Sequence, residues 1–219
     1  INKKKIGLTG ISWGGTIVSA VAGIDSRFAF VIPVYGGGYI HQHKMTAKQF
    51  REYNTKWDPA AHLPYAKMPM LWVNGFNEPV FPLDLFCKSA GTAAGTSILC
   101  IRPFLIHGHG FGWEEVWEID GFANGVVNGG KSIPTLGKPR VNRRDGLVHA
   151  KFTGELKSAV LGYTTAAKWK NRALRTIPCT IGKGEVIASK PLPREARAFM
   201  INARGGGVWT DGCVGSVLV

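Results

Sequence analysis

The stretch Ile6–Gly15, IGLTGISWGG, decides the fold of this chain of 219 residues. Its pattern predicts a short strand, a sharp turn at Gly10-Ile11-Ser12-Trp13-Gly14 and a helix that continues through the apolar segment Thr16–Ala22. Glycines two positions on either side of Ser12 let a strand and a helix pass close together. The serine hydroxyl would then stand open at a helix N-terminus, where peptide dipoles stabilise negative charge. We therefore interpret Ser12 as a nucleophile, with an ordinary glycine-rich turn as the alternative.

Residues 1–130 alternate between apolar segments and predicted helices. The later apolar segments are continuous and rich in β-branched and aromatic residues, as in strands buried on both faces: Arg27–Tyr35, Pro69–Asn74 and Thr96–Arg102. The helices expected after the first one are Thr46–Asn54, Pro82–Ala90 and Glu114–Val127. Four strand–helix units predict an α/β fold with a parallel sheet covered by helices on both faces. In such sheets, ligands bind beyond the carboxyl ends of the strands.

The sequence changes character at Asn128–Pro139, NGGKSIPTLGKP, where glycine and proline mark a linker. Short β-rich runs then recur, separated by turns: Leu147–Phe152, Lys157–Tyr163, Arg172–Ile177, Ala198–Asn202, Gly207–Trp209 and Gly215–Val219. This spacing predicts a small all-β sandwich. We expect an α/β domain at residues 1–130 and a β-sandwich domain at residues 131–219.

The basic residues gather in the C-terminal part. The chain has a formal net charge of +13, and residues 131–219 carry 16 Lys and Arg against 5 Asp and Glu. A solvated basic surface and a face that binds a polyanion both fit this distribution, whereas no nucleic-acid motif accompanies it. No apolar run is long enough for a transmembrane helix, so we expect no membrane partner.

The four cysteines, Cys87, Cys100, Cys179 and Cys213, show no C-x-x-C spacing. We therefore expect no metal site and no cofactor. A Cys179–Cys213 disulfide and buried free thiols both remain open.

A serine nucleophile needs a base, and the base needs an orienting acid. The acid should follow a later strand than the serine, and the histidine should follow the last strand. Glu78 lies three residues past Gly75, at the end of a predicted strand, and we favour it as the acid. Its rival, Asp84, is better placed to begin the next helix.

Two histidines follow the last predicted strand. We expect His109 to be the base, because the run Gly108-His109-Gly110-Phe111 is similar to a turn found in many serine hydrolases, and His107 is the alternative. We do not expect the other four histidines to be the base: His41, His43, His62 and His149. The backbone N–H of Trp13, directly after the nucleophile, is the expected oxyanion donor. Tyr35 and Gly36–Gly38 would either line the pocket or form a structural turn.

Taken in order, four segments resemble the α/β-hydrolase superfamily: IGLTGISWGG, VIPVYGGG, WDPAAHLPYAKMPMLWVNGFNEPVFPLD and HGHGFGW. Among its members, the chain looks most like the bacterial acetyl xylan esterase-like group, which is related to prolyl oligopeptidase. The resemblance assigns the nucleophile to Ser12, the acid to Glu78 and the base to His109. It also implies a secreted or periplasmic protein, and a C-terminal β-sandwich domain fits the group.

Two features depart from that family. The acid is usually aspartate, so Glu78 is either a tolerated variant or a sign of altered activity. The family's first strands and second oxyanion donor precede the serine, so we expect this chain to hold the C-terminal half of the parallel sheet. The strand edge at Ile6–Ile11 would then be unpaired and open to self-association or to a partner chain.

The resemblance implies a serine carboxylesterase that removes acyl groups, with acetyl foremost, from carbohydrate by means of Ser12, His109 and Glu78. A peptidase ranks below it, because nothing in the sequence specifies a peptide pocket. The alternative from another class is a truncated or non-catalytic hydrolase whose basic β-sandwich binds an anionic polymer or a protein partner.

Overall fold

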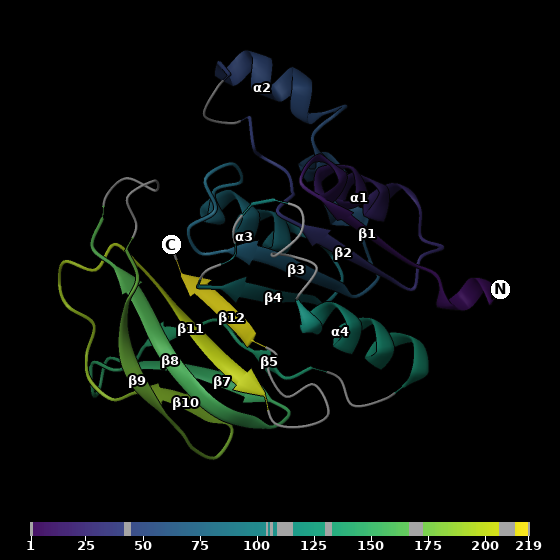
Figure 1. Cartoon of the computed structure of the whole chain (residues 1–219). Helices are drawn as coiled ribbons and strands as arrows, with labels where there is room; N and C mark the ends of the chain where they lie inside the picture. The colour runs from purple at the N-terminus through teal and green to yellow at the C-terminus, as the bar shows by residue number, and fades with distance from the viewer. Residues whose placement is uncertain are drawn as a thin grey trace.

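The computed structural model describes residues 2–41, 45–103, 105, 107–108, 116–129, 133–166 and 173–205, and the backbone of 213–218. Its first half is a four-stranded parallel sheet in the order β1-β2-β3-β4 (Figure 1). These strands are β1 (Gly7–Ile11), β2 (Phe30–Val34), β3 (Met70–Gly75) and β4 (Ser97–Arg102). The helices between and after them are α1 (Trp13–Ile24), α2 (Ala47–Asn54), α3 (Leu83–Thr92) and α4 (Trp117–Asn128). Short 3-10 turns lie at Lys3–Lys5, Pro59–Ala61 and Leu63–Tyr65.

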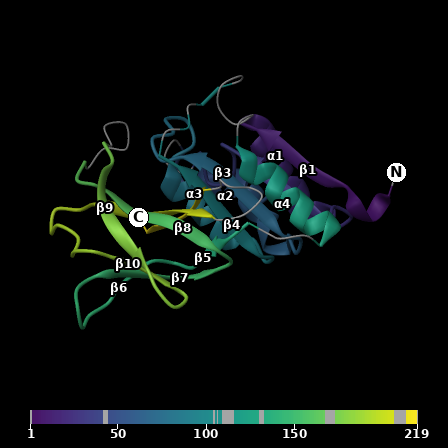
Figure 2. The ribbon, with the colours of Figure 1, turned by 60° about the horizontal axis from the view of Figure 1, so that its bottom comes forward.

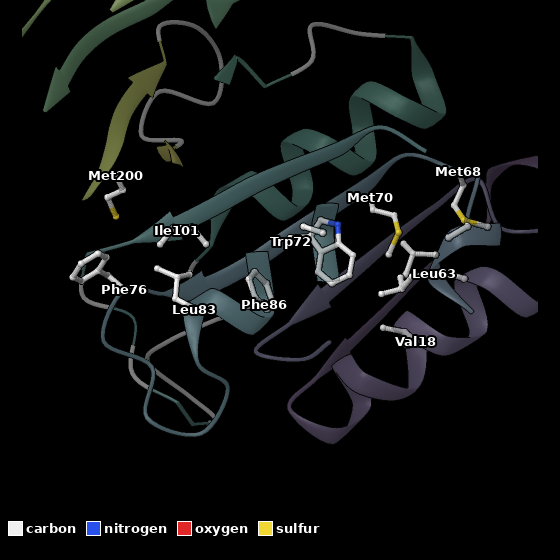
Figure 3. Close-up of a cluster of buried hydrophobic side chains, with 14 residues drawn as sticks. Val18, Leu63, Met68, Met70, Trp72, Phe76, Leu83, Phe86, Ile101 and Met200 are labelled. Carbon is white, nitrogen blue, oxygen red and sulfur yellow. The ribbon is translucent and has the colours of Figure 1, made fainter. Parts of the chain in front are cut away.

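The parallel sheet is buried on both faces because its strands are apolar at successive positions. Met70 and Trp72 of β3 pack in one cluster with residues of α1 and α3, as Figure 3 shows for Val18 and Phe86. Leu71 and Val73 belong to the opposite cluster, which includes Phe122 of α4. Side chains alternate across a strand, so a continuous apolar run is what a strand covered on both faces requires. The predicted parallel α/β arrangement is confirmed for this half.

The described strands between Thr135 and Leu218 form an antiparallel sheet with the order β12-β11-β8-β9-β10-β7-β5, and β6 pairs with β7. Its strands are β5 (Thr135–Leu136), β6 (Arg140–Val141), β7 (Val148–Thr153), β8 (Leu156–Thr164), β9 (Arg175–Ile181), β10 (Glu185–Ala188), β11 (Ala198–Gly205) and β12 (Cys213–Leu218). The end strands β12 and β5 are in contact, so the sheet curls around a core that includes Leu161, Ile177 and Ile201. The antiparallel β character is confirmed. The described pairings, however, give one curled sheet and do not separate it into the two layers of a sandwich.

Five of the six runs predicted in the second half overlap observed strands, and three observed strands have no predicted run. β5 and β6 have two residues each and β10 has four, which is too few residues for an alternation of apolar and polar side chains to be recognised in the sequence. The predicted run Gly207–Trp209 lies outside the described residues.

The two sheets meet at β4. The side-chain amide of Asn202, on β11, donates a hydrogen bond of 2.9 Å to the backbone oxygen of Ile101 on β4. Met200, also on β11, belongs to the same buried cluster as Ile101 and Phe76 (Figure 3). β12 contacts β4 as well. The change from parallel to antiparallel sheet falls near the predicted domain boundary, yet the two regions share part of one core.

Within the described ranges, β1 pairs only with β2, at the other edge of the parallel sheet. No helix in these ranges is long and apolar enough to cross a lipid bilayer.

Candidate active site

Ser12 occupies a strained turn between β1 and α1. Its φ and ψ are 57° and −119°, and α1 begins at the next residue, Trp13. The Ser12 N–H donates to the carbonyl of Val34 at 2.8 Å, which ties the turn to the end of β2. A positive φ costs a non-glycine residue about 1–3 kcal/mol and is characteristic of a nucleophile at a strand-to-helix turn.

Steric crowding explains some of the glycines around Ser12. A Cβ on Gly10 would lie 2.4 Å from the carbonyl oxygen of Gly14, and one on Gly15 would lie 2.6 Å from that of Val34. A Cβ on Gly36 would come within 2.4 Å of the Gly15 backbone. By contrast, a Cβ on Gly14 would meet nothing within 4 Å. The G-x-S-x-G pattern draws attention to Gly14, but close packing requires Gly10 and Gly15.

Glu78 lies in the loop after β3 and is completely buried. Its Oε1 accepts hydrogen bonds from the backbone N–H groups of Val80 at 2.7 Å and Phe81 at 3.2 Å. The loop is braced by Asn74, whose amide donates to the carbonyl of Phe81 at 3.2 Å. The rival acid Asp84 lies in the first turn of α3, as expected of a helix-initiating residue. The carboxylate of Glu78 is therefore held in one orientation by its own loop.

His107 lies between Ser12 and Glu78. Its Nε2 is 3.0 Å from the Ser12 Oγ, and its Nδ1 is 2.9 Å from Oε1 of Glu78. The imidazole is flanked by the rings of Tyr35, with a centroid distance of 4.9 Å, and Phe81, which stacks on it at 5.9 Å and 10°. Ser12, Glu78 and His107 thus follow the carboxyl ends of β1, β3 and β4, the edge where parallel sheets place their ligands. His109, the expected base, lies outside the described residues.

The loop after β2 forms another side of the site. Tyr35 and Tyr39 both have a positive φ, 52° and 65°. The buried carboxylate of Asp58 accepts the N–H of Tyr39 at 2.9 and 3.0 Å and that of Ala60 at 2.8 Å. Ser89 accepts the N–H of Gly38 at 2.9 Å. The sequence did not reveal Asp58 and Ser89 as supports of this loop, although Asp58-Pro59 is a recognisable start of a 3-10 turn.

Burial, followed by the negative charge of Glu78, raises the pKa of the Tyr35 hydroxyl well above its usual value of 10.0. This hydroxyl therefore stays protonated through the neutral range and remains a hydrogen-bond donor beside the site.

Aromatic rings continue outward from the serine. Trp13 is 57% exposed, and its ring centroid lies 6.0 Å from that of His41, which in turn lies 5.1 Å from the ring centroid of Tyr53 on α2.

The other described histidines have partners elsewhere. His62 faces the carbonyl of Lys56, and His149 lies on β7 between two carboxylates. None of His41, His62 and His149 contacts Ser12 in the hydrogen bonds of the described residues, and His43 lies outside those residues.

In the part of the chain that the structure describes, no group of three His, Cys, Asp or Glu side chains could hold a metal ion. Cys87 and Cys179 are free thiols among the described side chains. The side chain of Cys213 lies outside the described residues, so the Cys179–Cys213 disulfide stays an open alternative.

Comparison with known proteins gives structural neighbours only. No family model and no curated protein matches the sequence. The fold is similar to the acetyl xylan esterase from Paenibacillus sp. R4, with 18% identity, a TM-score of 0.41 and coverage of 49% of this chain and 42% of that one. The acetyl xylan esterase 1 from Thermoanaerobacterium sp. JW/SL YS485 has 15% identity, a TM-score of 0.42 and coverage of 52% and 44%. A puromycin hydrolase has 14% identity, a TM-score of 0.49 and coverage of 60% and 23%.

All three neighbours have less than 20% identity and TM-scores below 0.5. The chain spans less than half the length of each of the three. The chemistry of this chain therefore has to be inferred from the geometry around Ser12.

Proposed function

We propose that this chain carries the catalytic residues of a serine hydrolase that cleaves carboxylic esters. The observation that supports the proposal is the continuous hydrogen-bonded series from the Ser12 hydroxyl through His107 to the buried Glu78, with distances of 3.0 and 2.9 Å. A nucleophile, a base and an orienting acid in contact form the arrangement that acyl transfer requires. These contacts support His107, the alternative base of the sequence analysis, whereas the expected base His109 lies outside the described residues.

In this mechanism, Ser12 Oγ attacks the ester carbonyl while Nε2 of His107 takes the hydroxyl proton. The tetrahedral intermediate collapses to an acyl-serine, and His107 gives the proton to the departing alcohol. Water then attacks the acyl-serine with His107 again as the base, which releases the carboxylic acid and restores Ser12. Glu78 accepts Nδ1–H throughout, so it fixes the tautomer of the ring and stabilises the imidazolium.

The developing oxyanion needs backbone donors. Trp13 is the first residue of α1, and the first N–H groups of a helix have no partner within it. Its N–H therefore serves as one donor, assisted by the positive end of the α1 dipole. A second donor would come from the segments that precede the serine in the family that the sequence resembles.

For the substrate, we propose acyl esters of carbohydrate alcohols, with acetyl as the first acyl group to test. This narrower choice rests on the resemblance of the sequence to the acetyl xylan esterase-like group. The exposed Trp13 supports a site that is open to a bulky alcohol.

A fluorophosphonate tests the nucleophile on the chain as it is. We expect mass spectrometry to find a single adduct on Ser12, and none in Ser12→Ala. Labelling of other serines alone, or of none, would contradict the proposal and favour the non-catalytic alternative.

The two histidines provide a matched pair for identifying the base. We expect His107→Ala to slow labelling and p-nitrophenyl acetate hydrolysis by about a thousandfold or more, as loss of a base does in such triads. His109→Ala should leave both rates within about threefold of the wild type. The reverse result would assign the base to His109.

A further inference from the structure

The outer surface of β7 bears a cationic pocket far from the serine. It has a volume of about 340 Å³ and is lined by Gly137, Lys138, Arg140, His149, Lys151 and Glu185. Figures 1 and 2 both place β7 and β10 on the side of the molecule away from β1 and α1. The proposed ester hydrolysis uses none of these residues.

Strand register explains why these side chains meet. Val148 and Ala150 of β7 point into the core of the curled sheet, so His149 and Lys151 point outward. Arg140 on β6 lies directly across from His149, and Glu185 on β10 lies directly across from Lys151.

A backbone contact explains why Lys138 also lines the pocket. The N–H of Gly137 donates to the carbonyl of Lys151 at 2.8 Å, which brings the adjacent Lys138 to the same place. Three cations therefore line one hollow: Lys138 and Arg140 come from the segment at the start of β6, and Lys151 comes from β7.

The two nearby carboxylates, those of Glu185 and Asp145, both contact His149. Oε2 of Glu185 lies 3.4 Å from Nδ1 of His149, and Oδ2 of Asp145 lies 3.0 Å from its Nε2. Among the ion pairs of the described residues, none within 4 Å involves Lys138, Arg140 or Lys151. Like charges side by side on a sheet are destabilising, and an anion in the hollow would offset that repulsion.

We propose that the pocket of Lys138, Arg140 and Lys151 binds the carboxylate or sulfate groups of an acidic polysaccharide. Residues 131–219 carry 16 Lys and Arg against 5 Asp and Glu, so the surrounding field also attracts a polyanion. None of the six lining residues is Phe, Tyr or Trp, the side chains on which the bases of single-stranded nucleic acids stack. This disfavours a single-stranded nucleic acid as the ligand. The binding is independent of ester hydrolysis.

The test compares two triple variants of the full chain that each remove three positive charges. The pocket variant is Lys138→Gln, Arg140→Gln and Lys151→Gln. The control is Lys157→Gln, Lys190→Gln and Arg194→Gln, three exposed residues of the same region. Calorimetric titration with an oligogalacturonate provides the carboxylate arm, and a heparin oligosaccharide provides the sulfate arm. Circular dichroism checks that both variants fold.

We expect the pocket variant to raise the Kd for at least one glycan about tenfold or more, and the control to change it less than about threefold. The arm that shows this difference identifies the anionic group. Equal losses in the two variants, or no binding by the wild type, would overturn the proposal. A single-stranded oligonucleotide that binds the pocket more tightly than either glycan would overturn the choice of ligand.

Footprinting provides a second measurement that needs no variant. An amine-reactive acetylating reagent should modify Lys138 and Lys151 more slowly in the presence of the bound glycan, while the modification of Lys157 stays unchanged. Equal protection of all three lysines would contradict a defined pocket.

Discussion

At the scale of single residues, the site depends on a carboxylate whose position is fixed by its own loop. Glu78 stands where the resembled family usually has aspartate, and it still reaches Nδ1 of His107 at 2.9 Å while accepting two backbone N–H groups. The longer side chain is therefore compatible with the arrangement of a triad. Whether glutamate at this position lowers the activity is therefore a question about the rate of ester hydrolysis, which can be measured.

Glu78→Gln replaces the carboxylate by an amide of almost the same shape. An amide cannot stabilise the imidazolium, and it allows the wrong histidine tautomer, so we expect kcat to fall about a thousandfold or more. The measurement is p-nitrophenyl acetate hydrolysis, or the rate of fluorophosphonate labelling if turnover is slow. Asp84→Asn makes the same chemical change at the rival acid and should leave the rate within about twofold. Equal effects at the two positions would remove Glu78 from the mechanism.

The glycines around Ser12 also differ from one another in a measurable way. Gly10→Ala and Gly15→Ala would each place a Cβ well inside contact distance of rigid backbone, so we expect each to lower the free energy of unfolding by about 2 kcal/mol or more. Gly14→Ala meets no atom within 4 Å, and we expect a change of less than about 1 kcal/mol. Urea unfolding gives all three values. A Gly14→Ala loss as large as the other two would refute the steric account.

At the scale of elements, β1 is an edge strand that carries the nucleophile at its end. Its outer edge has no partner strand among the described residues, and Ile6, just before it, is 39% exposed. Such an edge is a template for pairing with another chain. The sequence predicts association there, and the observed strand order is consistent with that expectation.

We expect the isolated chain to self-associate through β1 as its concentration rises. Ile6→Lys places a charge beside the edge and should shift the sedimentation profile toward the monomer. Ile24→Lys changes an equally apolar residue, 67% exposed at the end of α1, and should not shift it. A chain that is monomeric at all accessible concentrations would refute this expectation, as would two variants with the same profile.

At the scale of the whole molecule, buried acids make the fold sensitive to alkali. Burial raises the pKa of Cys87 to about 12 and that of Cys179 to about 11, and it also raises the pKa of Tyr35. Well below pH 9.0, the usual pKa of a thiol, both states keep the thiol protons and these groups contribute nothing to the pH dependence of stability. Above it, the unfolded chain loses protons that the native chain keeps, so stability falls as pH rises.

We therefore expect the urea midpoint to decrease steadily between about pH 9 and pH 11. The double variant Cys87→Ala, Cys179→Ala should show a shallower decrease, because only Tyr35 then remains of the three groups. A midpoint that is constant over this range, or one that rises, would contradict the assignment.

The parallel half could be predicted from sequence because its signals are local. A continuous apolar run makes a strand buried on both faces, and Gly10 and Ser12 mark the turn. The curled antiparallel sheet could not be predicted, because β5, β6 and β10 are too short for a period and strand order is set by distant contacts. The sequence alone leaves two candidate bases, because His107 and His109 are two residues apart in one glycine-rich run; the fold brings His107 within hydrogen-bond distance of Ser12, and His109 lies outside the described residues.

The hydrogen bond from Asn202 to Ile101 has a mechanical consequence for the proposed chemistry. β4 leads into the segment that carries His107, and a strand at the edge of a sheet would bend easily if nothing supported it. β11 supplies that support with Asn202 and Met200, so the stiffness of the strand before His107 originates partly in a sheet that contains none of the proposed triad. The antiparallel region therefore supports β4. A change that weakens this support should make the orientation of the His107 imidazole less well defined, without altering any group that touches the ester.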